Sequence, residues 1–274
     1  MFKKRVLALL SSTILVAGLA VGCGSNSGSS SSTKVTVSGS TSVGSPMEKL
    51  AEVFEENNSG ITVEVQQLGS SAGIKNAIEG VSEIGMSSRD LKDEEKSSGI
   101  KETIIATDGI AVITNTANGV TDLTLDQVKD IYTGNITNWK EVGGNDAPIV
   151  VVSREDGSGT RDGFQEKVGF ESEELVSDAT ISDGSGNIKS TVEGNENAIG
   201  YISFGYLDEK VNAVKVNGVE INHETVSNNE YVIARPFILV HKEDISDNAK
   251  SLIDFILSDD GQSILEEKGF IRVN

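Results

Sequence analysis

Two long apolar segments, each broken near its centre by a charged residue, constrain the fold of this chain most. They cover residues 103–114 and 231–242, and their length and apolar character predict strands. Asp108-Gly109 interrupts the first segment and Arg235-Pro236 interrupts the second. Breaks at matching places are expected where a chain crosses twice between two lobes. We therefore predict one lobe from residues 34–108 plus 237–274 and another from residues 109–236, with two ordinary bulged strands as the alternative.

Short apolar runs alternate with amphipathic stretches along the rest of the chain, which is typical of an α/β protein. Apolar and polar residues alternate over residues 61–68, which predicts a strand, and apolar residues at helical spacing over residues 74–81 predict a helix. The sequence TLDQ at 124–127 is a capping box that predicts a helix start. The sequence SPME at 45–48 predicts another start, with proline at the first helical position.

The first 22 residues have the features of a secretory signal peptide. Three basic residues precede an apolar stretch over residues 6–21, and small residues precede Cys23, the only cysteine of the chain. This site resembles the lipobox of bacterial lipoproteins, so we expect Cys23 to be lipidated; an ordinary secretory peptide with an incidental cysteine is the alternative. Residues 23–33 are rich in Ser and Gly and predict a flexible tether after the lipid. We therefore expect an extracytoplasmic protein that is lipid-anchored to the cell membrane.

The charge balance excludes several classes of partner. The chain has 42 Asp and Glu against 23 Lys and Arg, a formal net charge of −19, so nucleic acid and anionic lipid are poor partners. Two histidines and one cysteine leave little for a transition-metal site, and we expect neither metal nor cofactor. Because an acidic body attracts anions poorly at long range, a bound anion must be held by local hydrogen bonds.

The sequence SREDGSGT, which starts at Ser153, carries the groups that hold an oxyanion. Arg154 supplies a planar fork of donors, Ser158 and Thr160 supply hydroxyls, and the helix start expected there offers free N–H groups. Similar Ser- and Gly-rich loops occur at residues 39–43 and 69–73. If two lobes face each other, the three loops converge on one point. A structural turn with an Arg–Asp pair and ordinary helix capping are the alternatives.

At these loops the chain resembles the phosphate-binding subunit of the bacterial high-affinity phosphate ABC importer. The resemblance covers nearly the whole chain after the tether, and it includes residues 125–139, which have no evident ligand role. Its motifs are GSTSV at 39–43, QLGSSAG at 67–73, IGMSSR at 84–89, REDGSGT at 154–160, AIGY at 198–201 and FILVHK at 237–242. The family implies a two-lobed α/β fold of the type II periplasmic-binding-protein kind, with a ligand cleft between lobes that are joined by a two-strand hinge.

The resemblance also implies a set of phosphate contacts by matching motifs. The matched positions are Ser42, the Val43 N–H, Ser70, Arg154, Ser158, Gly159 and Thr160. Thr41 lies beside this set, and Asp156 is expected to hold the Arg154 guanidinium in place.

One position departs from the family pattern. Many members have an aspartate after the strand at residues 84–87, where its carboxylate accepts the proton of hydrogen phosphate; here Ser88 stands there, followed by Arg89 and Asp90. We expect Ser88 to contact the ligand rather than only cap the next helix. Either Asp90 or another group accepts the proton, or sulfate is rejected less strongly. Arg89 is either a second positive contact or the partner of Asp90 or Asp93.

The sequence therefore predicts a monomeric receptor that binds inorganic phosphate, hands it to the permease subunits of an ABC importer and performs no chemistry. A receptor for sulfate, molybdate or tungstate is the alternative within the same class. A phosphatase or serine hydrolase is disfavoured, because the folded part has no G-x-S-x-G elbow before a helix and no histidine placed as a base. An adhesion or sensor module that borrows the fold is a further alternative.

Overall fold

The computed structural model describes residues 33–273. The predicted signal peptide, the predicted lipidation at Cys23 and the predicted tether lie outside the described residues, apart from Thr33, at which the first strand begins. Within residues 33–273, no helix combines the length and the apolar character that a membrane crossing requires.

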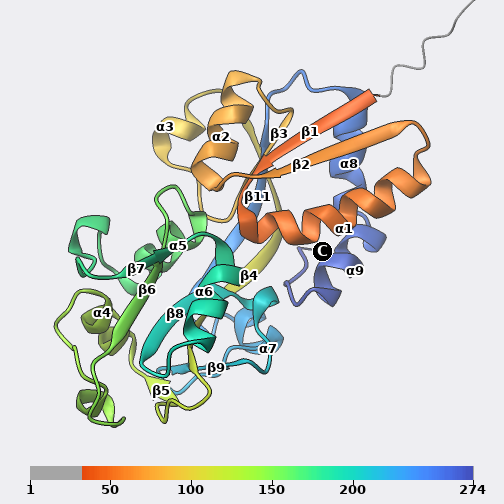
Figure 1. Ribbon diagram of the computed structural model, residues 1–274. Helices are drawn as coiled ribbons and strands as arrows, with labels where there is room; N and C mark the ends of the chain where they lie inside the picture. Colours follow the sequence, from red (N-terminus) through yellow and green to blue (C-terminus); the bar gives the residue numbers. More distant parts are fainter. Residues whose placement is uncertain (1–32, 274) are drawn as a thin grey trace, which may run out of the picture. The chain divides into compact units, whose positions relative to one another are not determined.

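The main sheet has nine strands, and eight of them follow the order β2-β1-β3-β11-β4-β8-β6-β7, while β9 pairs with β4 (Figure 1). The strands are β1 (Thr33–Gly39), β2 (Ile61–Gln67), β3 (Ile84–Ser87), β4 (Lys101–Asn115), β6 (Val150–Arg154), β7 (Thr180–Ser182), β8 (Ala198–Ser203), β9 (Val211–Ala213) and β11 (Ala234–His241). A small second sheet pairs β5 (Asp122–Leu123) with β10 (Lys215–Val216).

Helices cover this sheet and fill most of the connections between its strands. They are α1 (Thr41–Asn57), α2 (Ser70–Glu79), α3 (Asp93–Lys96), α4 (Leu125–Tyr132), α5 (Gly159–Val168), α6 (Gly184–Glu193), α7 (His223–Ser227), α8 (Asp247–Leu257) and α9 (Asp259–Glu267). Three short 3-10 helices, η1 (Trp139–Val142), η2 (Ser172–Glu174) and η3 (Phe204–Tyr206), complete the described elements.

The predicted helix starts have different outcomes. Thr124 caps α4 by accepting a hydrogen bond from the backbone N–H of Gln127, as predicted. The start predicted at Ser45 is wrong, because α1 begins at Thr41 with Ser40 as its N-cap. Pro46 therefore lies inside the helix rather than at its first position. The earlier start brings the GSTSV loop into the first turn of α1.

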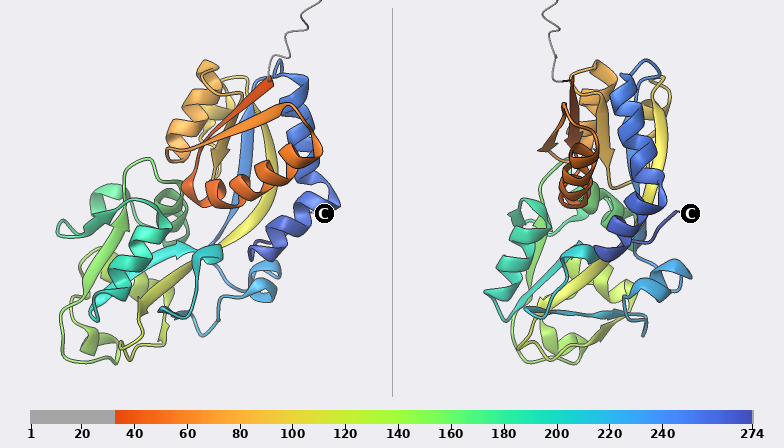
Figure 2. Two further views of the ribbon diagram at one scale, coloured as in Figure 1. Left: turned by 45° about the vertical axis from the view of Figure 1, so that its right-hand side comes forward. Right: turned by 90° about the vertical axis from the view of Figure 1, so that its right-hand side faces the viewer.

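The strands β4 and β11 run through both lobes of the molecule (Figures 1 and 2). They pair antiparallel, and Arg235 lies directly opposite Asp108 in their register. One hydrophobic cluster is built from residues between Val35 and Ala106 and between Phe237 and Phe270, which we call the first lobe. A second large cluster, which defines the second lobe, is built from residues between Ile110 and Ile233 together with Ile271. The chain thus has the predicted α/β fold of two lobes joined by two strands, while the exact lobe boundaries stay a prediction.

Candidate functional site

The first turns of α1, α2 and α5 meet at one buried point between the lobes. Ser42 Oγ lies 3.0 Å from Thr160 Oγ1, and Ser70 Oγ lies 3.3 Å from Ser88 Oγ. Ser40 Oγ donates to Ser88 Oγ at 2.8 Å. We call these five residues the serine cluster; the exposed fraction of each is at most 2 %. The cluster brings together hydroxyls from three helix starts and from the end of β3.

The parallel strands explain why these loops converge. β1 pairs in parallel with both β2 and β3, so the loops that follow their carboxyl ends lie at the same edge of the sheet. The α5 loop of the second lobe approaches so closely that Gly159 has no room for a side chain. A Cβ there would lie 2.1 Å from Ser70 Oγ and 2.7 Å from Ser88 Oγ. The backbone of α5 therefore packs directly on the hydroxyls of the first lobe.

Backbone N–H groups add to the hydroxyls. The N–H groups of Gly159 and Thr160 occupy the first two positions of α5, where no intrahelical acceptor exists. The start of α1 offers the N–H groups of Thr41 and Ser42 in the same way. Such helix starts carry a partial positive charge and favour anions.

Two of the predicted contacts already have partners within their own helix caps. The N–H of Val43 donates to Ser40 Oγ at 3.3 Å, and Ser158 Oγ accepts from the N–H of Arg161 at 3.3 Å. Ser158 is buried beside the cluster and keeps its own hydroxyl proton as a donor.

Arg154 ends β6 with its guanidinium buried and only partly paired. Its Nε and Nη2 atoms donate to the two carboxylate oxygens of Glu155, each at 2.7 Å, and Nη2 also donates to Thr41 Oγ1 at 3.1 Å. The Nη1 atom is buried and has no hydrogen-bond partner among residues 33–273. Burial of Glu155 opposes its ionisation, but the hydrogen bond and charge of Arg154 outweigh burial and lower the pKa of Glu155.

The predicted role of Asp156 is wrong. Asp156 pairs with Arg161 at 2.6 Å, and its side chain is almost fully exposed. Glu155 holds the Arg154 guanidinium instead, because its carboxylate meets the guanidinium fork with two parallel bonds.

Arg89 and Asp90 lie outside the serine cluster. Arg89 pairs with Glu95 at 2.8 Å and with Asp162 of α5 at 2.9 Å, so it links the two lobes. Of the two alternatives for Arg89, pairing with the carboxylate of Asp90 or Asp93 is wrong, because its carboxylate partners are Glu95 and Asp162; a contact with the ligand stays a prediction. Asp90 is exposed, whereas the cluster is buried, and the bond that it accepts from Arg89 is to its backbone carbonyl.

Arg235, which was not predicted from the sequence, is also part of the candidate site. Its guanidinium, 2 % exposed, donates to Ser42 Oγ at 3.1 Å and to Ser88 Oγ at 3.2 Å. Asp108 holds it with a 2.8 Å ion pair, in which burial of the pair raises the pKa of Asp108 and lowers that of Arg235. The signal was present, since opposite charges interrupt the two long apolar segments at matching places. These charges predicted a crossing between lobes, and the structure shows that they also form a buried ion pair beside the serine cluster.

The donors gathered here can form hydrogen bonds to an anion. Two buried arginines are each matched by a carboxylate: Arg235, which bonds the cluster, by Asp108, and Arg154, which bonds Thr41 next to Ser42, by Glu155. Among residues 33–273 no group of three or more His, Cys, Asp and Glu side chains is placed to hold a metal ion.

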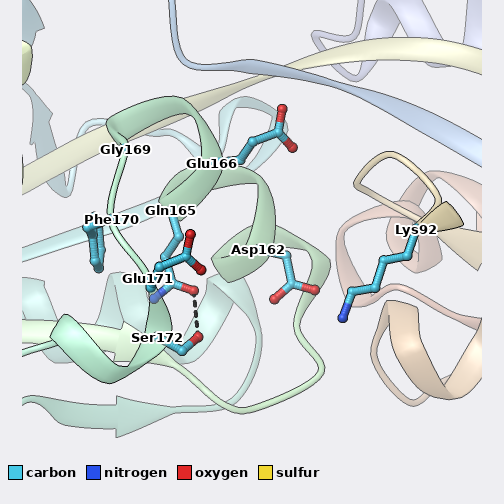
Figure 3. Close-up of a pocket in the computed structure, with 8 residues that line it drawn as sticks. All are labelled: Lys92, Asp162, Gln165, Glu166, Gly169, Phe170, Glu171 and Ser172. Atoms are coloured by element: carbon cyan, nitrogen blue, oxygen red, sulfur yellow. Dashed lines mark hydrogen bonds between the residues drawn. The ribbon is translucent and has the colours of Figure 1, made fainter.

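A separate cavity of about 420 Å³ opens beside α5 (Figure 3). Lys92 and Asp162 point into it from opposite sides, and Ser172 donates to the side-chain oxygen of Gln165 at 3.0 Å. Its lining contains no residue of the serine cluster.

Comparison with known proteins gives a consistent result. Residues 24–260 match the model of the PBP superfamily domain. The phosphate-binding protein PstS of Bacillus subtilis is 35% identical over 98% of this chain and 94% of its own length, and that of Borreliella burgdorferi is 31% identical over 87% and 90%. A crystal structure from Clostridium perfringens, described as a candidate phosphate ABC transporter substrate-binding protein with bound phosphate, matches with a TM-score of 0.87 and 64% identity, covering 88% of this chain and 100% of the other.

Proposed function

The chain belongs to the phosphate-binding subunits of bacterial phosphate ABC importers, a family within the PBP superfamily, and from that premise we propose that it captures one inorganic phosphate in the serine cluster and delivers it to the importer permease. The observation that carries this proposal is the buried Nη1 atom of Arg154, which has no partner among residues 33–273. A buried N–H without an acceptor is costly, and a phosphate oxygen satisfies it with a charge-assisted bond.

The proposed contacts surround the ligand from both lobes. The first lobe provides the hydroxyls of Ser42, Ser70 and Ser88, and the second lobe provides Arg154 with the hydroxyl of Thr160. The N–H groups of Gly159 and Thr160 complete the α5 side. Ser158 and the Val43 N–H remain predicted contacts, and Thr41 is a supporting residue because it binds Arg154 Nη2.

Capture proceeds by closure of the lobes about β4 and β11. Several bonds that cross between the lobes support this mechanism: Arg89 pairs with Asp162, and Tyr206 donates its hydroxyl proton to the backbone carbonyl of Thr41 at 3.2 Å. The α5 loop also accepts from the N–H of Ser71 through the Gly157 carbonyl at 3.3 Å. These contacts form only when the lobes are together, so the ligand and the contacts stabilise the same closed state.

We further propose that the chain acts as an extracytoplasmic monomer, anchored through a lipid on Cys23, and that it performs no chemistry. The two histidines support the last point, because neither stands beside the serine cluster. His223 lies 3.9 Å from Glu266, and His241 bonds the backbone carbonyl of Lys242. The serine hydroxyls therefore have no histidine base among residues 33–273.

Calorimetry on the purified full-length chain tests the proposal. Phosphate should bind tightly, and Arg154→Ala should weaken it by about a hundredfold, because charge-assisted hydrogen bonds contribute about 1.5–3 kcal/mol each. Arg272→Ala is the matched control, since this arginine pairs with Asp259 and Glu266 away from the cluster and should leave phosphate affinity unchanged. Absence of heat with phosphate in the unmodified chain would refute the proposal, and stronger binding of sulfate would indicate the alternative oxyanion receptor.

A further inference from the structure

Arg235 uses its whole donor capacity inside the protein. Nε and Nη2 donate to Asp108 Oδ2 at 3.1 Å and 2.8 Å, and Nη2 also donates to Ser42 Oγ at 3.1 Å. Nη1 donates to the backbone carbonyl of Ser88 at 3.1 Å and to Ser88 Oγ at 3.2 Å. A guanidinium carries five N–H donors, and these five bonds use all of them. Arg235 therefore has no N–H left for a ligand.

Arg154 differs from Arg235 in this respect. Its Nε and Nη2 atoms are engaged by Glu155 and Thr41, but Nη1 is without a partner in the described part of the chain. The two buried arginines thus have different roles: Arg154 can bind an anion directly, whereas Arg235 acts only on its neighbours.

The neighbours of Arg235 are hydroxyls, and a guanidinium determines how they share their protons. Arginine has no acceptor, so Ser42 Oγ and Ser88 Oγ must accept from it. Ser88 Oγ also accepts from Ser40 Oγ. A hydroxyl has two acceptor lone pairs and one proton, so Ser88 has both lone pairs filled and retains only its proton. That proton is left for Ser70 Oγ or for a ligand in the cluster.

We propose that Arg235, clamped by Asp108, is a positioning residue that fixes the hydroxyl of Ser88 as a hydrogen-bond donor toward the bound oxyanion and occupies one lone pair of Ser42. This inference rests on the proposed function. A ligand oxygen that carries a proton finds no acceptor at Ser88, so this side of the site favours an unprotonated oxygen. The more highly ionised form of phosphate should therefore bind better than the singly charged form.

Asp108 makes the arrangement rigid through its second oxygen. Oδ1 accepts from Ser203 Oγ at 3.0 Å and from the N–H of Phe204 at 3.2 Å, at the end of β8 and the start of η3 in the second lobe. The charged and titratable groups that face Arg235 are Asp108, Arg154 and Tyr201. Burial raises the pKa of Tyr201 above its already alkaline ordinary value, which leaves Asp108 as the group whose own titration must be controlled for.

The experiment measures phosphate affinity of the full-length chain at two pH values, on either side of the second ionisation of phosphate. The main variant is Asp108→Asn with Arg235→Met, which leaves no unpaired buried charge and keeps an acceptor for Ser203 and Phe204. Asp108→Asn alone is the matched control, since it removes the titration of Asp108 but retains the Arg235 guanidinium, which has no acceptor atom and can only donate to a serine oxygen. Arg272→Met controls for the loss of an arginine that does not touch Ser42 or Ser88, since Arg272 pairs with Asp259 and Glu266.

The unmodified chain and both controls should bind phosphate better at the higher pH. In the double variant the lone pairs that Arg235 occupied on Ser42 and Ser88 become free to accept a ligand proton. The ratio of phosphate affinity at the higher pH to that at the lower pH should therefore decrease by about tenfold, the effect of about one hydrogen bond. An equal loss of affinity at both pH values in the double variant would overturn the inference, because it would indicate a structural role alone. If circular dichroism shows that the double variant or Asp108→Asn is unfolded, Arg235→Lys replaces it. Its phosphate affinity is compared at the same two pH values, since lysine can occupy fewer of the serine lone pairs. Failure of the unmodified chain to bind phosphate would instead refute the proposed function.

Discussion

Gly159→Ala tests the closed arrangement of the lobes without removing any donor. The added Cβ would lie 2.1 Å from Ser70 Oγ and 2.8 Å from Ser70 Cβ, where ordinary contact begins at 3.4 Å. Rotation of the Ser70 hydroxyl cannot relieve the second contact, because a Cβ atom is fixed by the backbone. The α5 loop and the α2 loop must therefore separate, while the N–H of residue 159 remains available to the ligand.

A separation of more than an ångström breaks the bonds that close the site. The contact between Ser42 and Thr160, now 3.0 Å, and the bond from Arg154 to Thr41, now 3.1 Å, would both pass the limit of a hydrogen bond. Together with one ligand bond lost across the gap, at about 0.5–1.5 kcal/mol for neutral bonds and about 1.5–3 kcal/mol for charged ones, the cost reaches about 3 kcal/mol. Phosphate affinity should fall by roughly a hundredfold.

Isothermal calorimetry with phosphate measures this loss, and Gly186→Ala is its matched control. Gly186 also lies in the first turn of a second-lobe helix, and a Cβ there would meet nothing within 4 Å. The control should bind as the unmodified chain does. If Gly159→Ala binds phosphate within about threefold of the unmodified chain, the close packing of α5 on Ser70 is not needed for binding and the reasoning fails.

Two further predictions concern stability. Asp108→Ala leaves the Arg235 charge buried without its partner and should lower the free energy of unfolding in urea by about 3–5 kcal/mol. Asp247→Ala breaks an exposed pair and should lower it by less than about 1 kcal/mol. A similarly small loss for Asp108→Ala would contradict the assigned pair. The pKa of Glu155 is lowered in the folded state, so its contribution to stability is complete above the unfolded value of about 4.3 and is lost as the pH falls through the folded value. Below about pH 4 the melting temperature should therefore fall more steeply with pH for the unmodified chain than for Glu155→Gln. Equal slopes would refute the pairing of Glu155 with Arg154.

The sequence was sufficient to predict the parts of the fold that follow from local pattern. The strand β2 follows from alternation, β4 from a long apolar run and the start of α4 from cap chemistry, and the structure contains all three. The start of α1 was misplaced because two candidate caps lie close together. Ser45 precedes a proline and a glutamate, as a cap does, but Ser40 is the residue at which the chain leaves β1 and turns.

The sequence does not determine which side chains pair with the buried arginines. Arg154 is followed by two acidic residues, Glu155 and Asp156, and composition does not tell which one turns back to the guanidinium. The turn around Gly157, which has a positive φ of 80°, leaves Asp156 exposed toward Arg161. Arg235 reaches Ser42 and Ser88 only because β11 crosses beside β3 and β4, a neighbourhood set by the sheet order.

A crystal structure of the chain with phosphate tests the central claim most directly. We expect one phosphate among Ser42, Ser70, Ser88 and Thr160, with an oxygen within hydrogen-bond distance of Arg154 Nη1 and with Arg235 bonded to the serines rather than to the ligand. Phosphate bound only elsewhere, for example in the cavity beside α5, or out of reach of Arg154 Nη1, would contradict the account.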